Sequence, residues 1–142
     1  MTYLVNRRQI TVQWGDCDPN GMLFNSRVFE YFDTGAWALF QAALGVKPSD
    51  LGRTFDIMGI PLVDARANFM LPLKFGDTVD ILSSIKEFRR SSFAVEHRLL
   101  VDGALAVEGS EVRVWATADK DDAAKLKSLP IPADIMERFK AR

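Results

Sequence analysis

The sequence contains one cysteine, one histidine and almost no net charge, and each of these shortages excludes a class of protein. Cys17 has no second cysteine with which to form an intrachain disulfide, and a lone cysteine gives no indication of a metal cluster. The formal net charge is -1. Charge therefore gives no reason to expect nucleic acid or a membrane surface as the main partner.

Long hydrophobic runs are also missing. No apolar stretch approaches the roughly 20 residues that a transmembrane helix needs, and residues 1–8 lack the apolar core of a signal peptide. We therefore expect a cytoplasmic protein. The sequence shows no internal repeat and no low-complexity linker. Its 142 residues, of which 48% are hydrophobic, predict a single domain over residues 1–142 with one core.

The first part of the chain predicts a strand followed by a long helix. Residues 8–14 alternate between polar and apolar, as in a half-buried strand whose apolar face carries Ile10, Val12 and Trp14. Residues 26–44 repeat apolar side chains at helical spacing: Phe29, Phe32, Ala36, Leu39, Phe40 and Ala43. Ser26 is the expected N-cap and Gly45 the expected stop. Residues 47–56 predict a loop that holds at most a short helical turn.

After Pro61 the pattern changes to strands. We expect them at residues 62–71, 78–88, 92–101 and 104–116, with a short closing helix at residues 133–140. Asp102-Gly103 is a strong hairpin signal. This order predicts the α+β class, with an antiparallel sheet of about five strands. The Phe-rich helix can be buried if that sheet wraps around it.

Two acids stand out between the first strand and the helix. Asp16 and Asp18 are two residues apart, and Pro19-Asn20-Gly21 after them predicts a turn. An acid at a strand end, facing a helix N-terminus, is suited to chemistry on a carbonyl group. Aspartate and asparagine are also among the commonest turn residues, so the local pattern by itself leaves a catalytic and a purely structural role open.

Several motifs spread along the chain together carry a resemblance. They are Gly15-Asp16-Cys17-Asp18-Pro19 with Gly21, Gly59-Ile60-Pro61, the segment from Lys86 to Phe93, Glu111-Val112-Arg113-Val114, and Ile131-Pro132-Ala133-Asp134. With them the chain resembles the hotdog-fold acyl-CoA thioesterases over nearly its whole length. The most similar branch is the 4-hydroxybenzoyl-CoA thioesterase-like one, which uses an aspartate. The resemblance implies a hotdog fold and hydrolysis of aryl or short- to medium-chain acyl-CoA.

The resemblance also implies roles for the residues of the first motif. Asp18 is expected to attack the thioester carbonyl as a nucleophile or to activate a water as general base. The backbone N–H of Asn25, in the first turn of the helix, is expected to bind the developing oxyanion. Asp16 is expected to hold the loop, and Cys17 to be a small buried residue. No metal and no cofactor are expected.

Further residues are expected to bind the two ends of the substrate. The acyl group is assigned to Phe24, Asp33 and Ile60, where Asp33 would suit a phenolic hydroxyl. Ile60 departs from the family, because a hydroxyl-bearing residue there would help to bind such a group. Arg27 departs too, since relatives often have asparagine. Phosphates of coenzyme A are assigned to Arg89, Arg90, Ser91, Lys125 and Lys127.

The family resemblance further implies a homotetramer, or at minimum a homodimer, because the open edge of a curled sheet is hidden by pairing across a two-fold axis. The active site would then combine Asp18 of one subunit with residues 64–68 of the other. Two other functions stay open. One is a catalytically silent protein that binds acyl-CoA. The other is a dehydratase or hydratase, which usually needs a histidine base, whereas His97 lies mid-strand and is expected to be structural.

Overall fold

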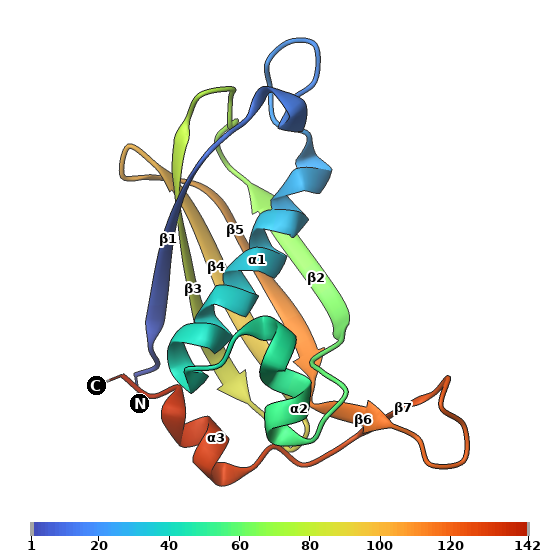
Figure 1. Cartoon of the computed structure of the whole chain (residues 1–142). Coiled ribbons are helices and arrows are strands. Elements are labelled where there is room, and N and C mark those ends of the chain that lie inside the picture. The colour runs from blue at the N-terminus through green and yellow to red at the C-terminus, as the bar shows by residue number, and fades with distance from the viewer. Residues whose placement is uncertain (1, 142) are drawn as a thin grey trace.

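A computed structural model describes residues 2–141 (Figure 1). The main sheet contains β1 (Val5–Thr11), β2 (Leu62–Phe69), β3 (Thr78–Phe88), β4 (Ser92–Val101) and β5 (Ala104–Val114). The helices are α1 (Asn25–Leu44), α2 (Leu51–Phe55) and α3 (Ala133–Arg138), and β6 (Ala116–Ala118) pairs with β7 (Leu126–Ser128) in a small hairpin. No helix among these residues is both long and apolar enough to span a membrane.

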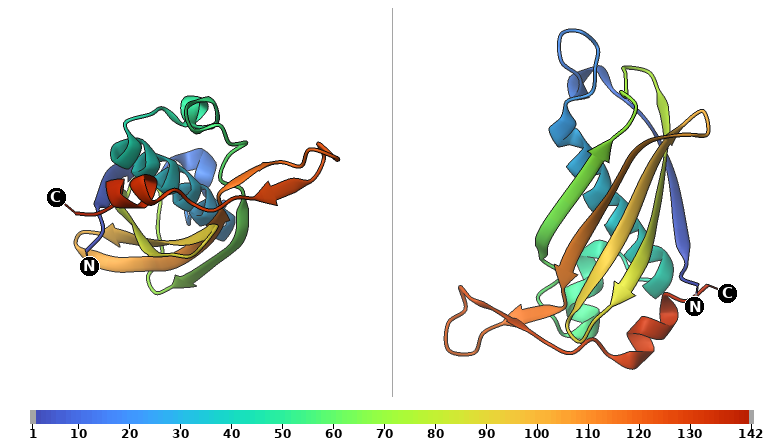
Figure 2. Two further views of the ribbon diagram at one scale, coloured as in Figure 1. Left: turned by 90° about the horizontal axis from the view of Figure 1, so that it is seen from below. Right: turned by 180° about the vertical axis from the view of Figure 1, so that it is seen from behind.

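The sheet is antiparallel, has the strand order β1-β3-β4-β5-β2, and wraps around α1 (Figures 1 and 2). This is the five-stranded hotdog arrangement expected from the sequence, which is thereby confirmed. The strand bounds of β3 and β4 match the predicted ranges. The strand predicted at residues 104–116 divides into β5 and β6, because the chain leaves the sheet at Trp115, whose N–H donates to the Ser91 carbonyl.

Helix α1 is buried along the stripe that its apolar spacing predicts. Phe32, Ala36, Leu39 and Phe40 are each at most 2% exposed. At Gly35 the helix approaches the sheet so closely that an added Cβ would lie 2.6 Å from the Ser83 hydroxyl. The helix ends as predicted at Gly45, whose left-handed φ of 68° suits a glycine C-cap.

Two local predictions at the start of the chain are wrong. Trp14 does not belong to a strand, because β1 ends at Thr11 and Trp14 begins a 3₁₀ turn in which it is 57% exposed and packs on Phe75. Ser26 is not the N-cap of α1. Phe24 occupies that position, since its N–H donates to the Asp16 carbonyl at 2.9 Å and thereby sets where the helix begins.

The long axis of the molecule separates two poles. The loop that precedes α1 lies at one pole, while the β3–β4 turn, α2, α3 and the β6–β7 hairpin lie at the other (Figure 1). The strand β2 forms one edge of the sheet, with residues Leu62 and Val63 46% and 61% exposed. The separation of the two poles and the position of β2 at the sheet edge determine which predicted site residues can meet within one chain.

Candidate active site

Asp18 is held in a defined orientation by the turn that follows it. Its Oδ1 accepts hydrogen bonds from the N–H groups of Asn20 at 2.9 Å and Met22 at 3.1 Å. Gly21, with a φ of 79°, allows the chain to fold back so that both donors reach the same oxygen. None of the hydrogen bonds within residues 2–141 uses Oδ2 of Asp18. One carboxylate oxygen is thus anchored and the other is available.

Asp16 has a different role, because it ties this loop to the helix. Its carboxylate accepts a hydrogen bond from the Tyr31 hydroxyl at 3.2 Å and lies 3.9 Å from the Arg27 guanidinium. Burial, followed by the nearby charge of Asp16, raises the pKa of Tyr31, so the phenol remains a hydrogen-bond donor. Arg27 also pairs with Glu30 at 2.8 Å. The expected loop-holding part of Asp16 therefore has a structural basis in α1.

The N-terminus of α1 is open to a ligand. Its N-cap, Phe24, has no side-chain acceptor and makes no capping hydrogen bond. The first N–H groups of a helix have no acceptor within that helix, and the helix dipole adds a partial positive charge at this end. The N–H of Asn25 is the first of these donors. This combination can stabilise a developing negative charge.

A pocket of about 540 Å³ opens beside these groups. Asp18 and Asn25 both line it, and Phe24 joins them as an apolar wall. The remaining lining residues are apolar and come from the loop and α1, from the end of β2 and the segment after it, and from β5: Met22, Leu23, Val28, Phe69, Met70, Leu71, Pro72, Leu73 and Val107. The structure therefore brings three of the predicted site residues together in the lining of one pocket.

Cys17 lies between the two acids but is poorly suited to be a nucleophile. Burial, with the charges of Asp16 and Asp18, raises the pKa of its thiol. Thiolates rather than thiols are the reactive form of cysteine. The Cys17 thiol instead donates to the Gln13 carbonyl at 3.4 Å, and the residue is half-buried, not fully buried as expected.

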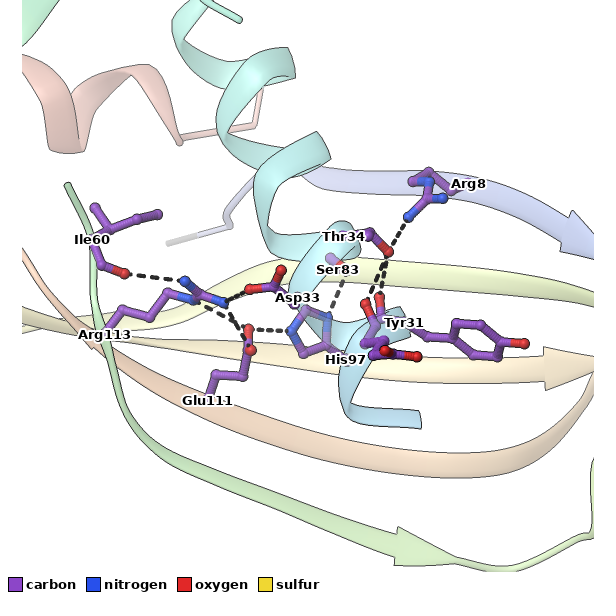
Figure 3. A network of polar contacts seen from close by, with 10 residues as sticks. Arg8, Tyr31, Asp33, Thr34, Ile60, Ser83, His97, Glu111 and Arg113 are labelled. Atoms are coloured by element: carbon purple, nitrogen blue, oxygen red, sulfur yellow. Dashed lines mark hydrogen bonds and ion pairs between the residues drawn. The ribbon is translucent and has the colours of Figure 1, made fainter. Parts of the chain in front are cut away.

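A chain of buried polar groups runs beneath α1 (Figure 3). Arg113, on β5, donates to both oxygens of Glu111, to the Ile60 carbonyl at 3.1 Å and to Asp33 on α1 at 2.6 Å. His97 continues the chain from Glu111, at 2.9 Å, to the Ser83 hydroxyl, at 2.7 Å. Every buried side-chain nitrogen or oxygen among residues 2–141 has a partner.

The charges in this chain of buried polar groups balance one another. Burial acts to raise the pKa of Glu111, but hydrogen bonds from His97 and Arg113 outweigh it, so the pKa is lowered overall. Because the Glu111 carboxylate can only accept, the His97 Nε2 atom must carry a hydrogen. In the neutral ring, Nδ1 then accepts the Ser83 hydroxyl hydrogen. His97 is completely buried and stacks on Phe32, which fits the structural role expected for it.

The residues assigned to the acyl group are separated. Phe24 lines the pocket, whereas Asp33 lies two turns along α1, with a side chain 51% exposed. Ile60 is 2% exposed and offers its carbonyl to Arg113 rather than its side chain to the surface. A direct side-chain contact between Ile60 and a ligand is therefore not available in this chain.

The residues assigned to coenzyme A lie in elements at the pole opposite the loop that precedes α1 and contains Asp18 (Figure 1). Arg89, Arg90 and Ser91 form the β3–β4 turn, and Lys125 and Lys127 belong to the β6–β7 hairpin. Arg89 is paired with Glu87 at 2.6 Å, while Arg90 forms no ion pair among residues 2–141. Since α1 alone, with 20 residues, is about 30 Å long, one chain does not bring these cations to its own Asp18.

Three residues that matter here were not predicted as site residues from the sequence. Tyr31 gave no signal, because an aromatic residue on a helix usually indicates core. Glu111 and Arg113 did give one: both occupy inward positions of a strand, two residues apart, where charged side chains are rarely found unless paired. Two opposite charges at neighbouring inward positions could have indicated a buried ion pair.

Several known proteins resemble this chain. The profile of the thioesterase-like superfamily matches residues 12–139. The 4-hydroxybenzoyl-CoA thioesterase of Pseudomonas sp. (strain CBS-3) is 29% identical over 135 residues, which cover 91% of this chain and 93% of that protein. A crystal structure of an aspartate-to-asparagine mutant of 4-hydroxybenzoyl-CoA thioesterase complexed with 4-hydroxybenzoyl-CoA has a TM-score of 0.84 at 27% identity, covering 96% and 99% of the two chains. A gentisyl-coenzyme A thioesterase has a TM-score of 0.77 at 30% identity, covering 94% and 98%.

Proposed function

The chain belongs to the thioesterase-like superfamily and is a thioester hydrolase, and we propose that it cleaves aryl acyl-CoA thioesters with Asp18 and the N-terminus of α1. The observation that carries this proposal is the pocket in which an oriented carboxylate and an uncapped helix N-terminus lie together. The relative crystallised with its hydroxybenzoyl thioester carries an aspartate-to-asparagine change, which supports an aspartate as the catalytic group.

In the nucleophilic route, Oδ2 of Asp18 attacks the thioester carbonyl carbon. The carbonyl oxygen becomes an oxyanion, which accepts the Asn25 N–H. The C–S bond then breaks, and the coenzyme A thiolate leaves and takes up a proton. Water hydrolyses the resulting mixed anhydride, which releases the carboxylic acid and restores Asp18.

In the general-base route, Asp18 instead takes a proton from a water molecule as that water attacks the same carbon. The proton passes to the departing thiolate, and the same oxyanion site is used. Single turnover in ¹⁸O-labelled water separates the two routes. Label in the Asp18 carboxylate requires the anhydride, because the general-base route forms no bond to the enzyme.

The substrate class follows from the pocket and from Asp33. The apolar lining suits an aromatic ring, and the named relatives act on hydroxylated aryl groups, hydroxybenzoyl and gentisyl. A carboxylate such as Asp33 accepts a hydrogen bond from a phenolic hydroxyl. Phe24 would pack against the ring. Ile60 would act only through its backbone, as the acceptor that helps to hold Arg113.

The position of the coenzyme A residues supports a homodimer. Two copies that pair their β2 edges antiparallel across a two-fold axis would bring the Asp18 pole of one beside the opposite pole of the other. Arg89, Arg90, Ser91, Lys125 and Lys127 of one subunit would then bind the nucleotide at its partner's site. Residues 64–68, which lie in β2, would line the interface. Two such dimers would form the expected homotetramer.

The proposal is tested by the variant Asp18→Asn over a panel of acyl-CoA substrates. General acid–base catalysis contributes about 10²- to 10⁴-fold, so kcat should fall by at least about 100-fold. Asn20→Ala is the matched control, because its side chain is exposed and only its backbone N–H contacts Asp18. Equal rates for wild type and Asp18→Asn would reject Asp18 as the catalyst. Tight binding of intact acyl-CoA without turnover by the wild type would indicate a silent binding protein instead.

A further inference from the structure

Arg113 is a buried cation that contacts two carboxylates, although one carboxylate would balance its charge. The residue is 2% exposed and lies between the sheet and α1 (Figure 3). Glu111 already supplies a carboxylate to it, with an Nη2 to Oε2 distance of 3.0 Å. The guanidinium nevertheless reaches a second carboxylate, Asp33, by a 2.6 Å hydrogen bond from the same nitrogen.

Asp33 differs from the other partners of Arg113 in its exposure. Glu111 is 1% exposed and the Ile60 residue 2%, whereas the Asp33 side chain is 51% exposed. The bond from Arg113 uses Oδ1 of Asp33, and no hydrogen bond within residues 2–141 uses Oδ2. Asp33 is thus anchored by Arg113 at one oxygen, and about half of its side chain is exposed at the surface of α1.

Asp33 lies on the same side of α1 as Asn25, the residue of the proposed oxyanion site. Asn25, Phe29 and Asp33 follow one another at intervals of four residues, which places them as neighbours along one side of a helix. Two turns separate the Asn25 N–H from Asp33, about 12 Å along the axis. Phe29, 37% exposed, lies between them. An aryl acyl group that binds its carbonyl oxygen at Asn25 can lie along this side with its far end at Asp33.

We propose that Arg113 is a positioning residue that holds the Asp33 carboxylate toward the acyl site, where its free oxygen accepts a hydrogen bond from a hydroxyl at the tip of an aryl acyl group. Arg113 itself does not touch the substrate. It acts through Asp33 and thereby selects for substrates that carry a donor. This inference rests on the proposed thioesterase function and adds a specificity determinant to it.

The surroundings of Arg113 explain how it can orient Asp33. Four hydrogen bonds leave the guanidinium toward Glu111, Ile60 and Asp33, and its carbon lies 5.9 Å from the centre of the Trp37 ring. A side chain fixed on so many sides cannot follow movements of Asp33. The ordering of Asp33 is therefore complete before substrate binds, and preorganisation of this kind strengthens recognition. His97, between Glu111 and Ser83, fixes Glu111 in turn.

The test compares 4-hydroxybenzoyl-CoA with benzoyl-CoA, which differ only in the hydroxyl. The readout is the ratio of their kcat/KM values, measured for wild type, Asp33→Asn and Arg113→Lys. The wild type should prefer the hydroxylated substrate. Hydrogen bonds to charged groups contribute enough for the ratio to fall about tenfold in each single variant. Lysine keeps the charge of Arg113 but loses the fork that contacts Glu111 and Asp33 together.

A double variant separates positioning from a general structural effect. If Arg113 acts through Asp33, Asp33→Asn with Arg113→Lys loses no more of the preference than Asp33→Asn alone. Should Arg113→Lys fail to fold, Glu111→Gln replaces it, because glutamine keeps the shape and an acceptor for His97 while weakening the hold on Arg113. Glu111→Gln should then reduce the preference for 4-hydroxybenzoyl-CoA in the wild-type background. It should not reduce that preference further when Asp33→Asn is also present, and this result would likewise show that Arg113 acts through Asp33.

Two results would overturn the inference. One is a fall in kcat/KM that is equal for both substrates in the Arg113 and Glu111 variants, because a merely structural residue lowers both together. The other is a wild type that cleaves both substrates equally well. Either result leaves Asp18-dependent cleavage of acyl-CoA intact, so it is distinguishable from failure of the proposed function, in which wild type and Asp18→Asn do not differ on any substrate.

Discussion

At the scale of single residues, the two acids of the first motif make different contacts. Asp18 lines the pocket, and its Oδ2 takes part in no hydrogen bond among residues 2–141, while Asp16 accepts a hydrogen bond from Tyr31 on α1. Arg27, where the chain departs from the family, lies 3.9 Å from Oδ1 of Asp16, whereas Tyr31 donates to Oδ2. Burial and the two neighbouring carboxylates raise the pKa of the Cys17 thiol, which makes it a poor nucleophile.

Removal of the Tyr31 hydroxyl should loosen the catalytic loop. Tyr31→Phe deletes the 3.2 Å bond to Asp16, and a misplaced carboxylate reacts more slowly. We expect kcat to fall about tenfold, with a loss of about 1 kcal/mol in the free energy of unfolding. Tyr3→Phe is the matched control, since no hydrogen bond of the Tyr3 hydroxyl is found among residues 2–141. Equal kcat values for the two variants would exclude an anchoring role for Tyr31.

Glu111 should make the stability of the protein depend on pH. Its pKa in the folded state is below the ordinary value of 4.5, so the stabilisation is present above about pH 4.5 and is lost as pH falls through the folded pKa. Urea unfolding at a series of pH values should show that Glu111→Gln flattens this acid-side loss. The exposed Glu108→Gln on the same strand should leave it unchanged. A wild-type profile retained in Glu111→Gln would show that other groups control acid unfolding.

At the scale of elements, the contact between α1 and the sheet depends on a glycine. Gly35→Ala would place a Cβ 2.6 Å from the Ser83 hydroxyl, which would have to turn away from His97. Crowding of a core contact costs about 1–3 kcal/mol, more than the about 1 kcal/mol that alanine gains in a helix. We expect a lower Tm. Gly15→Ala, whose added Cβ meets nothing within 4 Å, should leave the Tm unchanged, and an unchanged Tm in Gly35→Ala would contradict the close approach.

At the scale of the whole molecule, the proposed site needs two copies of the chain. Light scattering should find a dimer or tetramer. Val63→Asp, at the exposed β2 edge, should shift the mass toward a monomer and lower activity by about 100-fold. Leu126→Asp, also an exposed apolar residue but in the β6–β7 hairpin, should keep the wild-type mass. A wild type that is a stable monomer and fully active would contradict the proposed assembly.

Sequence by itself determined the elements whose signals are local. The bounds of β3 and β4, the turn at Asp102 and Gly103 and the glycine stop of α1 all follow from neighbouring residues, because periodicity and turn conformations act over a few positions. The acid at position 18 and the helix behind it were visible for the same reason.

The tertiary structure alone decided which distant groups meet. It placed β2 at the far edge of the sheet, moved the start of α1 to Asn25 through the bond from Phe24 to Asp16, and joined Arg113 to Asp33, 80 positions apart. It also placed the residues assigned to coenzyme A at the pole opposite the loop that contains Asp18. None of these contacts has a local signal, since each arises from how the sheet wraps around α1 and from which buried charges must then be paired.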